Sequence, residues 1–315
     1  METAKRPYRW SILLVILFGI GAILCYAVVG YIKYRFSQPV GSGPAGPVVS
    51  QVPFESTWTD RKVLLLGLGD SVTAGFGVQS CHSYFNRLIE NPPDEYDDMK
   101  GLCLSRVLPH LESRNQAVSG STSLDHLKQV EKELENQPAE LFGLVVMTTG
   151  GNDLIHDYGR SPPREGAMYG ATLEQARPWI ENYRVRLGKI LDRITESFPG
   201  GCLIFLADIY DPTDGVGNAS DAGLPDWPDG LAILQEYNTI LHDAAEAREN
   251  VVLVPMHDLF LGHGIYCTDG SNKHYCSEDP YYWYGYNLED PNHRGYDALR
   301  RLFLNKIVKH RDEIR

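Results

Sequence analysis

The chain has 315 residues, 43% of them hydrophobic, which is enough for two small domains or for one α/β domain of about 250 residues. It carries 29 Lys and Arg against 41 Asp and Glu, a formal net charge of −12. The electric field of a chain with this negative net charge repels nucleic acids and anionic lipid headgroups. The composition therefore argues against nucleic acid as a partner.

The N-terminal part of the sequence is strongly apolar. Trp10 to Tyr31 contains no charged residue and is about as long as a helix that crosses a bilayer. Basic residues flank it with a slight excess on the N-terminal side, which favours a cytoplasmic N-terminus. We therefore expect residues 1–35 to be a short tail and a single-pass transmembrane anchor, with the rest of the chain outside the cytoplasm. A cleaved signal peptide and a secreted protein are the alternative.

The next segment, residues 36–60, is rich in Gly, Pro and Ser. This composition is typical of a flexible or extended tether. The folded domain is accordingly expected over residues 61–315.

Four cysteines lie in polar, loop-like sequence, as disulfide partners do: Cys81, Cys103, Cys267 and Cys276. The natural pairs are Cys81 with Cys103 and Cys267 with Cys276, although four cysteines permit three pairings. Two histidines near the second pair raise the alternative of a metal site. The spacing does not match the close cysteine pairs of structural zinc sites, so we expect disulfides and no metal.

Short apolar runs alternate with helical patterns along the rest of the chain. The runs predict strands at Lys62–Leu68, Leu144–Thr149, Cys202–Ile209 and Val251–Pro255, with a shorter candidate at Asn115–Val118. The helical patterns cover Ser123–Glu135, Ile180–Ser197, Leu231–Glu249 and Arg294–His310. This alternation indicates an α/β domain with a mostly parallel sheet covered by helices.

Three predicted loops are long for such a domain: Ile155–Trp179, Asp211–Gly230 and Gly262–Asp290. Two of them leave the carboxyl ends of strands, which is the edge where ligands bind in open α/β sheets.

The first strand ends in a sequence that places a serine at the start of a helix, Gly67-Leu68-Gly69-Asp70-Ser71. Charge that develops on Ser71 would be stabilised by the helix N-terminus, but a helix N-cap is an equally common role for serine. The dinucleotide pattern G-x-G-x-x-G fails at Val72, and the pattern G-x-S-x-G fails at Thr73.

A second candidate lies before the last helix, where Asp290 precedes His293 by three residues. In a turn, the carboxylate can orient the imidazole and leave its other nitrogen free to take a serine proton. The structural alternative is that Asp290 or Asn292 only caps the helix.

Two glycine-containing turns could supply hydrogen-bond donors to an oxyanion. Gly120 follows a predicted strand, and Asn152 follows the strongest strand pattern within Thr149-Gly-Gly-Asn-Asp153. Each is also compatible with an ordinary turn.

Together, in this order, the four segments resemble the SGNH or GDSL hydrolase family. The matching residues are Gly69-Asp70-Ser71, Gly120, Gly150-Gly151-Asn152-Asp153 and Asp290-Pro291-Asn292-His293. The resemblance extends over essentially all of residues 61–315. It implies a flavodoxin-like three-layer α/β/α sandwich and no metal or organic cofactor.

The resemblance also implies the roles of the residues in ester hydrolysis through an acyl-enzyme. Ser71 would be the nucleophile, His293 the general base and acid, and Asp290 the carboxylate that orients it. The amides of Ser71 and Gly120 and the side chain of Asn152 would form the oxyanion hole.

The substrate is not fixed by these motifs, because relatives include esterases, lysophospholipases, thioesterases and carbohydrate deacetylases. A small-molecule, glycan or lipid ester is therefore expected. The aromatic run Tyr281–Tyr286 either contacts a sugar ring or acyl group or packs its own loop. An acyltransferase using the same acyl-enzyme, or a non-catalytic binding protein on the same fold, is the alternative.

Overall fold

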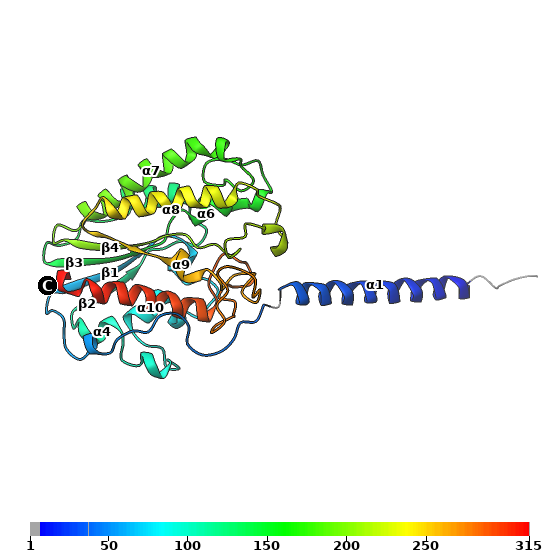
Figure 1. Cartoon of the computed structure of the whole chain (residues 1–315), viewed down its shortest axis with the longest axis horizontal. Helices are drawn as coiled ribbons and strands as arrows, with labels where there is room; N and C mark the ends of the chain where they lie inside the picture. Colours follow the sequence, from blue (N-terminus) through cyan, green and yellow to red (C-terminus); the bar gives the residue numbers. More distant parts are fainter. Residues whose placement is uncertain (1–6, 37, 315) are drawn as a thin grey trace, which may run out of the picture. The chain divides into compact units, whose positions relative to one another are not determined.

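The computed structural model of the chain describes residues 7–36 and 38–314, with the side chains of residues 13–28 and 38–314 (Figure 1). It divides into two compact units, Met1–Pro39 and Val40–Arg315. Helix α1, Pro7–Phe36, forms the described part of the first unit up to residue 36.

Helix α1 covers the stretch that was predicted to be a transmembrane anchor. In the parts of the chain that the structure describes, no helix combines the length and the apolarity needed to span a membrane. The side chains of Trp10 and Tyr31, at the ends of the predicted span, lie outside the described residues. The transmembrane helix is thus not confirmed, and the location of the second unit outside the cytoplasm stays a prediction.

The second unit is built on a five-stranded, all-parallel sheet with the strand order β2-β1-β3-β4-β5. The strands are β1 (Lys62–Leu68), β2 (Leu111–Asn115), β3 (Leu141–Met147), β4 (Cys202–Ala207) and β5 (Val251–Val254). The prediction of an α/β domain with a parallel sheet is confirmed. The short strand lies at Leu111–Asn115 and begins four residues earlier than predicted. The prediction was displaced because this edge strand is largely exposed and its polar sequence has no apolar run.

Helices cover both faces of the sheet, with α7 and α8 on one side and α10 on the other (Figure 1). The longer helices are α5 (Ser123–Lys132), α7 (Leu173–Glu196), α8 (Gly230–Glu246) and α10 (His293–Lys309). The shorter ones are α2 (Ser71–Ala74), α3 (Tyr84–Ile89), α4 (Leu104–Val107), α6 (Gly151–Ile155) and α9 (Met256–Phe260). Single 3₁₀ turns are η1 (Val52–Phe54), η2 (Ser80–His82), η3 (Asp97–Met99), η4 (His156–Gly159), η5 (Ala219–Ala222) and η6 (Arg311–Ile314).

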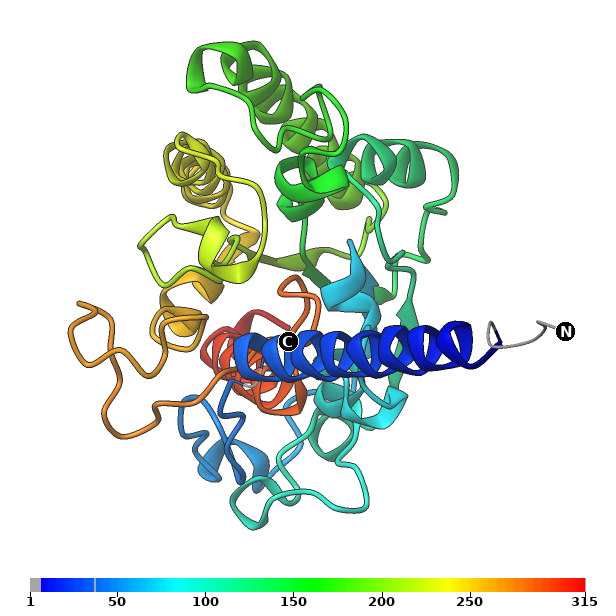
Figure 2. The same ribbon diagram turned by 90° about the vertical axis from the view of Figure 1, so that its right-hand side faces the viewer.

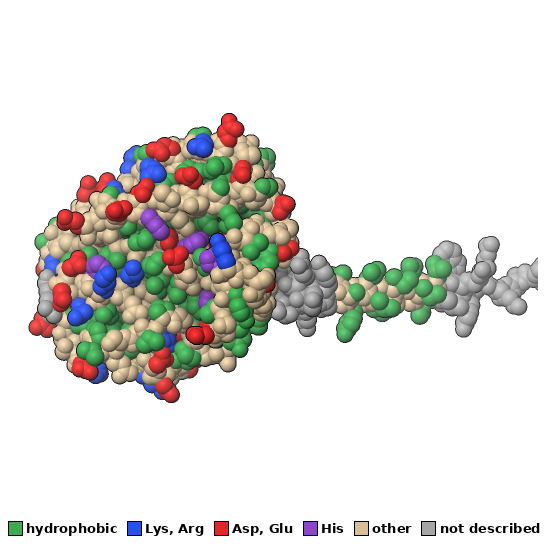
Figure 3. Space-filling model, in the orientation of Figure 1, with side chains coloured by type: hydrophobic (Ala, Val, Ile, Leu, Met, Phe, Trp, Pro, Cys, Tyr) green, Lys and Arg blue, Asp and Glu red, His purple; other side chains and the backbone are tan. Residues whose placement is uncertain are grey.

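The apolar core is split by the sheet into two clusters. Successive side chains of a strand point to opposite faces, so Val63 and Leu65 pack with α10 while Leu64 and Leu66 pack with α7 and α8. Because β1, β3 and β4 are buried on both faces, their sequences are continuously apolar. On the outer surface in Figure 3, acidic and basic side chains are interspersed.

The segment predicted as a tether packs against the sheet domain from Val40 onward. Ala45, Val49, Phe54 and Trp58 are buried in the same apolar cluster as α10. A side chain at Gly46 would lie 2.6 Å from the Cα atom of Ala298 in α10. The compact unit therefore begins at Val40, before the predicted boundary at residue 61, because apolar side chains spaced along this extended chain reach the core.

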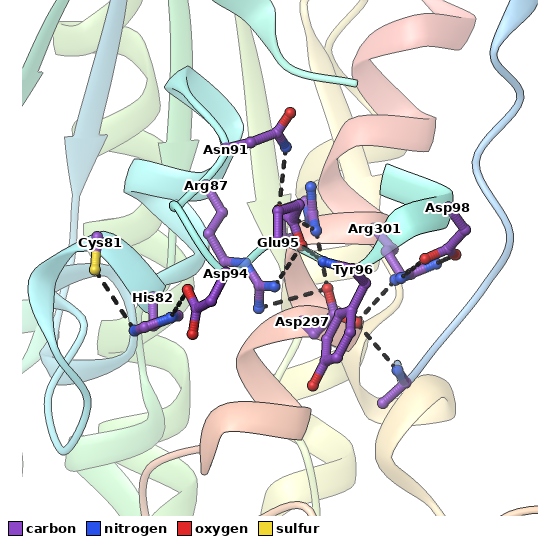
Figure 4. A network of polar contacts seen from close by, with 12 residues as sticks. Cys81, His82, Arg87, Asn91, Asp94, Glu95, Tyr96, Asp98, Asp297 and Arg301 are labelled. Atoms are coloured by element: carbon purple, nitrogen blue, oxygen red, sulfur yellow. Dashed lines mark hydrogen bonds and ion pairs between the residues drawn. The ribbon is translucent and has the colours of Figure 1, made fainter. Parts of the chain in front are cut away.

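A network of buried ion pairs fixes α10 to the surrounding segments (Figure 4). Asp297 is fully buried and accepts hydrogen bonds from Arg300 at 3.0 Å, from Arg301 at 2.9 Å and from the backbone nitrogen of Ala45 at 3.0 Å. Glu95 pairs with Arg87 at 2.7 Å and with Arg300 at 2.9 Å. Charges removed from water need such partners, so these contacts constrain the position of α10.

The predicted disulfides are not formed. Among the described residues, which include all six cysteines, no two are bonded to each other. Cys81 is exposed in turn η2, whereas Cys103 is buried at the start of α4. The polar sequence around these cysteines reflects turns and caps, which does not require that they be paired.

We predict that Asp297→Asn lowers the free energy of unfolding by about 3 to 5 kcal/mol, because it leaves buried arginines without their carboxylate. Urea denaturation measures this loss. The matched control is Asp97→Asn, whose carboxylate forms an exposed pair with Lys100 at 2.6 Å, and we expect it to cost less than about 1 kcal/mol. Equal losses in the two variants would show that the buried network does not determine stability.

Candidate active site

The carboxyl ends of β1 and β3 approach each other closely at the centre of the sheet. Gly69 has φ +122°, and a side chain there would collide with the carbonyl oxygen of Thr148. Directly after this contact, Thr148 donates a hydrogen bond from Oγ1 to the Asp70 carboxylate at 2.7 Å. The turn between β1 and α2 is thereby held against the end of β3.

Asp70 caps helix α2 and so fixes the residue that follows it. Its Oδ1 accepts a hydrogen bond from the backbone nitrogen of Val72 at 3.1 Å. Burial raises the pKa of Asp70 to about 6, although the hydrogen bonds from Thr148 and Val72 oppose this. Ser71 therefore occupies the first position of α2 and is partly exposed at the carboxyl edge of the sheet.

Asn152 lies in α6, directly after the turn that ends β3. Gly150 has φ +94° in this turn, and a side chain there would lie 2.8 Å from the hydroxyl oxygen of Tyr183. Asn152 is buried and donates a hydrogen bond from Nδ2 to the carbonyl oxygen of Ser121 at 2.9 Å. The structure brings Asn152 and Ser71 to the wall of one pocket.

Gly120 is not brought to that pocket. It has φ +80°, is exposed, and lines a separate hollow with Asp125 and Lys128. Its neighbour Ser121 nevertheless bonds to Asn152, so the loop that contains Gly120 is attached next to α6. The sequence motif correctly predicts a glycine turn here, and its place in an oxyanion hole stays a prediction.

A buried polar chain that the sequence motifs did not indicate supports this loop. Ser121 donates to the carbonyl oxygen of Gly69 at 3.1 Å and lies 2.7 Å from His126 Nε2. His126 Nδ1 lies 2.8 Å from Thr149 Oγ1. Burial lowers the pKa of His126 to about 4, so this ring is neutral at pH 7 and links the two loops.

Asp290 is buried close to Ser71. Its Oδ2 accepts a hydrogen bond from Asn287 at 2.7 Å, and its Oδ1 is left without a hydrogen-bond partner. Burial raises the pKa of Asp290, while the nearby hydroxyl of Ser71 and the Asn287 amide lower it. A carboxylate with an unused acceptor therefore lies beside the predicted nucleophile.

His293, the first residue of α10, is exposed. Within the described residues, no hydrogen bond joins His293 to Ser71 or Asp290. Its ring instead meets that of His82, with the ring centroids 5.0 Å apart and the planes at 72°. Burial, His82 and Arg87 lower the pKa of His293, which favours its neutral form.

His82 is a neighbour of His293 that no sequence motif indicates. Its Nε2 lies 2.8 Å from the carboxylate of Asp94, and its Nδ1 lies 3.5 Å from Cys81 Sγ (Figure 4). It comes from turn η2, more than 200 residues before His293, so only the fold brings the two rings together.

The loops after β4 and β5 lie on the same side of the domain (Figures 1 and 2). Asp214 joins them, because its carboxylate accepts hydrogen bonds from the backbone nitrogens of Gly262, Gly264 and Tyr266 at 2.7 to 2.9 Å. Burial raises the pKa of Asp214 to about 6, against these hydrogen bonds. This acidic side chain thus serves the internal structure of the loops.

The aromatic run near Asp290 is mainly structural. Tyr282, Trp283 and Tyr284 are buried, and Trp283 stacks on His263 with the ring centroids 3.4 Å apart. Of this run, Tyr286 is the ring that extends into solvent, at 85% exposure. The interpretation that the aromatic run packs its own loop is therefore favoured for Tyr282, Trp283 and Tyr284.

The structure thus places a serine after the first strand, an asparagine after the third and a carboxylate beside that serine. The chain belongs to the GDSL-like lipase/acylhydrolase family, whose family description matches residues 68–298. A search of curated protein sequences found no match.

Solved structures with a similar fold include several hydrolases. A catalytic mutant of an acetylxylan esterase from Geobacillus stearothermophilus is 17% identical, with 79% of this chain and 96% of that chain covered and a TM-score of 0.49. A psychrotrophic esterase from Pseudoalteromonas sp. is 16% identical, with 78% and 97% covered and a TM-score of 0.44. A putative GDSL-like lipase from Parabacteroides merdae is 18% identical, with 82% and 100% covered and a TM-score of 0.46.

The site makes stability depend on pH through Glu289, which lines the pocket beside Ser71. Burial raises the pKa of Glu289 to about 7, and Asp290 and Asp70 add to the effect. At a pH above the ordinary pKa of a glutamate, Glu289 loses its proton in the unfolded chain but keeps it in the folded chain. Glu289 therefore destabilises the fold increasingly as the pH rises to about 7.

We therefore predict that the stability of Glu289→Gln relative to the wild type rises by about 1 to 3 kcal/mol between pH 4.5 and pH 8. Urea denaturation at the two pH values measures this difference. Glu236→Gln, at an exposed position of α8, is the control. A relative stability of Glu289→Gln that is the same at both pH values would contradict the prediction.

Proposed function

We propose that this protein is a serine ester hydrolase that cleaves carboxylic esters through an acyl-enzyme on Ser71. The observation that carries the proposal is the position of Ser71 at the N-terminus of α2, on the wall of a pocket that it shares with Asn152 and beside the Asp290 carboxyl. Family membership agrees with this chemistry.

Ser71 attacks the ester carbonyl and His293 takes its proton. In the resting geometry the His293 ring rests against His82, so it turns toward Ser71 before it acts. Exposed side chains change rotamer in nanoseconds or less, so this rotation does not limit turnover. The unpartnered Oδ1 of Asp290 is then available to accept a hydrogen bond from the imidazole.

The tetrahedral oxyanion needs donors on the other side of the carbonyl. Asn152 uses one N–H to bond Ser121 and retains its second N–H for the oxyanion. The backbone amide of Ser71 at the helix N-terminus is the second donor. The resemblance to the family implies the amide of Gly120 as a third, although Gly120 lines a separate hollow in this structure. After the alcohol leaves with a proton from His293, water releases the acyl group by the same route.

Hydrolysis of p-nitrophenyl butyrate tests this function. We expect Ser71→Ala to lower kcat/KM by more than about 1,000-fold because the nucleophile is lost, and Asn152→Ala to lower kcat by about 100- to 1,000-fold because one oxyanion donor is lost.

Ser119→Ala, at an exposed serine of the Gly120 loop, is the matched control and should keep the wild-type rate. Circular dichroism verifies that each variant is folded. A folded Ser71→Ala variant with undiminished hydrolysis would exclude Ser71 as nucleophile. Ester formation with an added alcohol in place of hydrolysis would identify the enzyme as an acyltransferase.

A further inference from the structure

An apolar pocket opens beside Ser71 and extends away from it. Polar side chains on its wall are Ser71, Asn152 and Asp70, together with residues that include Asp208, Asp211 and Glu289. Other parts of the wall come from α6, from the loop after β4, from turn η5 and the loop that follows it, and from the first turns of α8. Apolar side chains that line these walls include Leu154, Ile155, Leu224, Leu231 and Leu234.

Two aromatic residues of the same pocket, Trp227 and Tyr169, use their polar atoms in hydrogen bonds to the backbone. Trp227 donates from Nε1 to the carbonyl oxygen of Ala171 at 2.8 Å, and Tyr169 donates from its hydroxyl to the carbonyl oxygen of Pro225 at 2.6 Å. The two rings pack with their centroids 4.8 Å apart. Because these polar atoms are already satisfied, the rings offer an apolar ligand contact area with little polar competition.

A strained turn places a third ring against this wall. Asp157 and Tyr158 have φ angles of +65° and +46°, in the left-handed region that residues other than glycine rarely adopt. The turn is held because Asp157 accepts hydrogen bonds from Ser161 at 2.7 Å and from Arg164 at 2.9 Å. Strain of this kind concentrates at ligand sites, and here it directs Tyr158 to the pocket and to Tyr169.

The position of His293 decides which half of an ester this pocket receives. The pocket is lined by Ser71 and Asn152, whereas His293 lies outside it, next to His82. In ester cleavage the departing alcohol takes its proton from the histidine, so the alcohol occupies the histidine side of the serine. The pocket, which His293 does not line, is left for the acyl group.

We propose that this pocket binds the acyl chain of the substrate and that the enzyme prefers esters of longer fatty acids, such as octanoate, over acetate esters. The inference rests on the proposed function of Ser71 and adds its substrate class. Burial of one methylene group favours the transition state by about two- to fourfold, so the preference grows with chain length until the pocket is full.

Kinetics with p-nitrophenyl acetate, butyrate, hexanoate and octanoate test the substrate class on the full chain. We expect kcat/KM to be about 100-fold higher for octanoate than for acetate. Ala222→Trp, which fills the pocket from turn η5, should lower kcat/KM for octanoate by more than about 10-fold and for acetate by less than about twofold. Ala232→Trp is the matched control, because Ala232 is an exposed residue of α8 that does not line the pocket.

A flat or falling profile with chain length, or equal effects of Ala222→Trp on both esters, would overturn the proposal. So would a preference for octyl acetate over ethyl octanoate, since it would place the alcohol in the pocket.

A binding measurement separates failure of the pocket from failure of the catalytic proposal. Isothermal titration calorimetry should show that methyl octanoate binds to the Ser71→Ala variant. Binding should also change the tryptophan fluorescence of the variant, because Trp227 lines the pocket. It should bind at least 10-fold more weakly to the Ser71→Ala, Ala222→Trp double variant. Binding without turnover in the wild type would reject the proposed catalysis alone, and equal binding to both variants would reject the pocket.

Discussion

The hydrogen bond from Thr148 to Asp70 joins the ends of β1 and β3, and the site depends on it. Both side chains are buried, and Asp70 also caps α2, so one carboxyl determines where the helix starts and where Ser71 lies. Thr148 is in turn 2.9 Å from Thr73 Oγ1, which lies 2.7 Å from the Tyr84 hydroxyl in α3. The glycine at position 69 is required because any side chain would separate the two strand ends.

The other half of the site depends on the position of α10. Asn292 caps this helix through the nitrogens of Arg294 and Gly295, and its amide bonds the carbonyl oxygen of Tyr282 at 2.7 Å. One turn further on, Asp297 binds two arginines and the segment at Ala45. The helix that begins with His293 is therefore fixed at its cap and one turn further on, and the His293 ring lies against that of His82.

The sequence predicted what depends on local pattern and missed what depends on distant contacts. The strands β1, β3, β4 and β5 were placed within a few residues because their apolar runs are buried on both faces. Strand β2 was displaced because its exposed edge sequence, Leu111–Asn115, has no apolar run. Helix α7 starts at Leu173, earlier than predicted, through a capping box between Thr172 and Gln175. Of the residues that the motifs single out, Ser71 and Asn152 line one pocket and Asp290 lies beside Ser71. Nothing local in the sequence indicates that His82 lies against His293 or that Val40 to Trp58 pack on α10.

Covalent labelling tests the central claim, the nucleophilicity of Ser71, most directly and does not require knowledge of the natural ester. The folded protein is treated with an alkyl fluorophosphonate, and intact-mass spectrometry and peptide mapping then locate the adduct. The account predicts one adduct, on the peptide that contains Ser71, formed by the folded protein and not by the denatured chain. An adduct on another residue, or none in the folded protein, would contradict it.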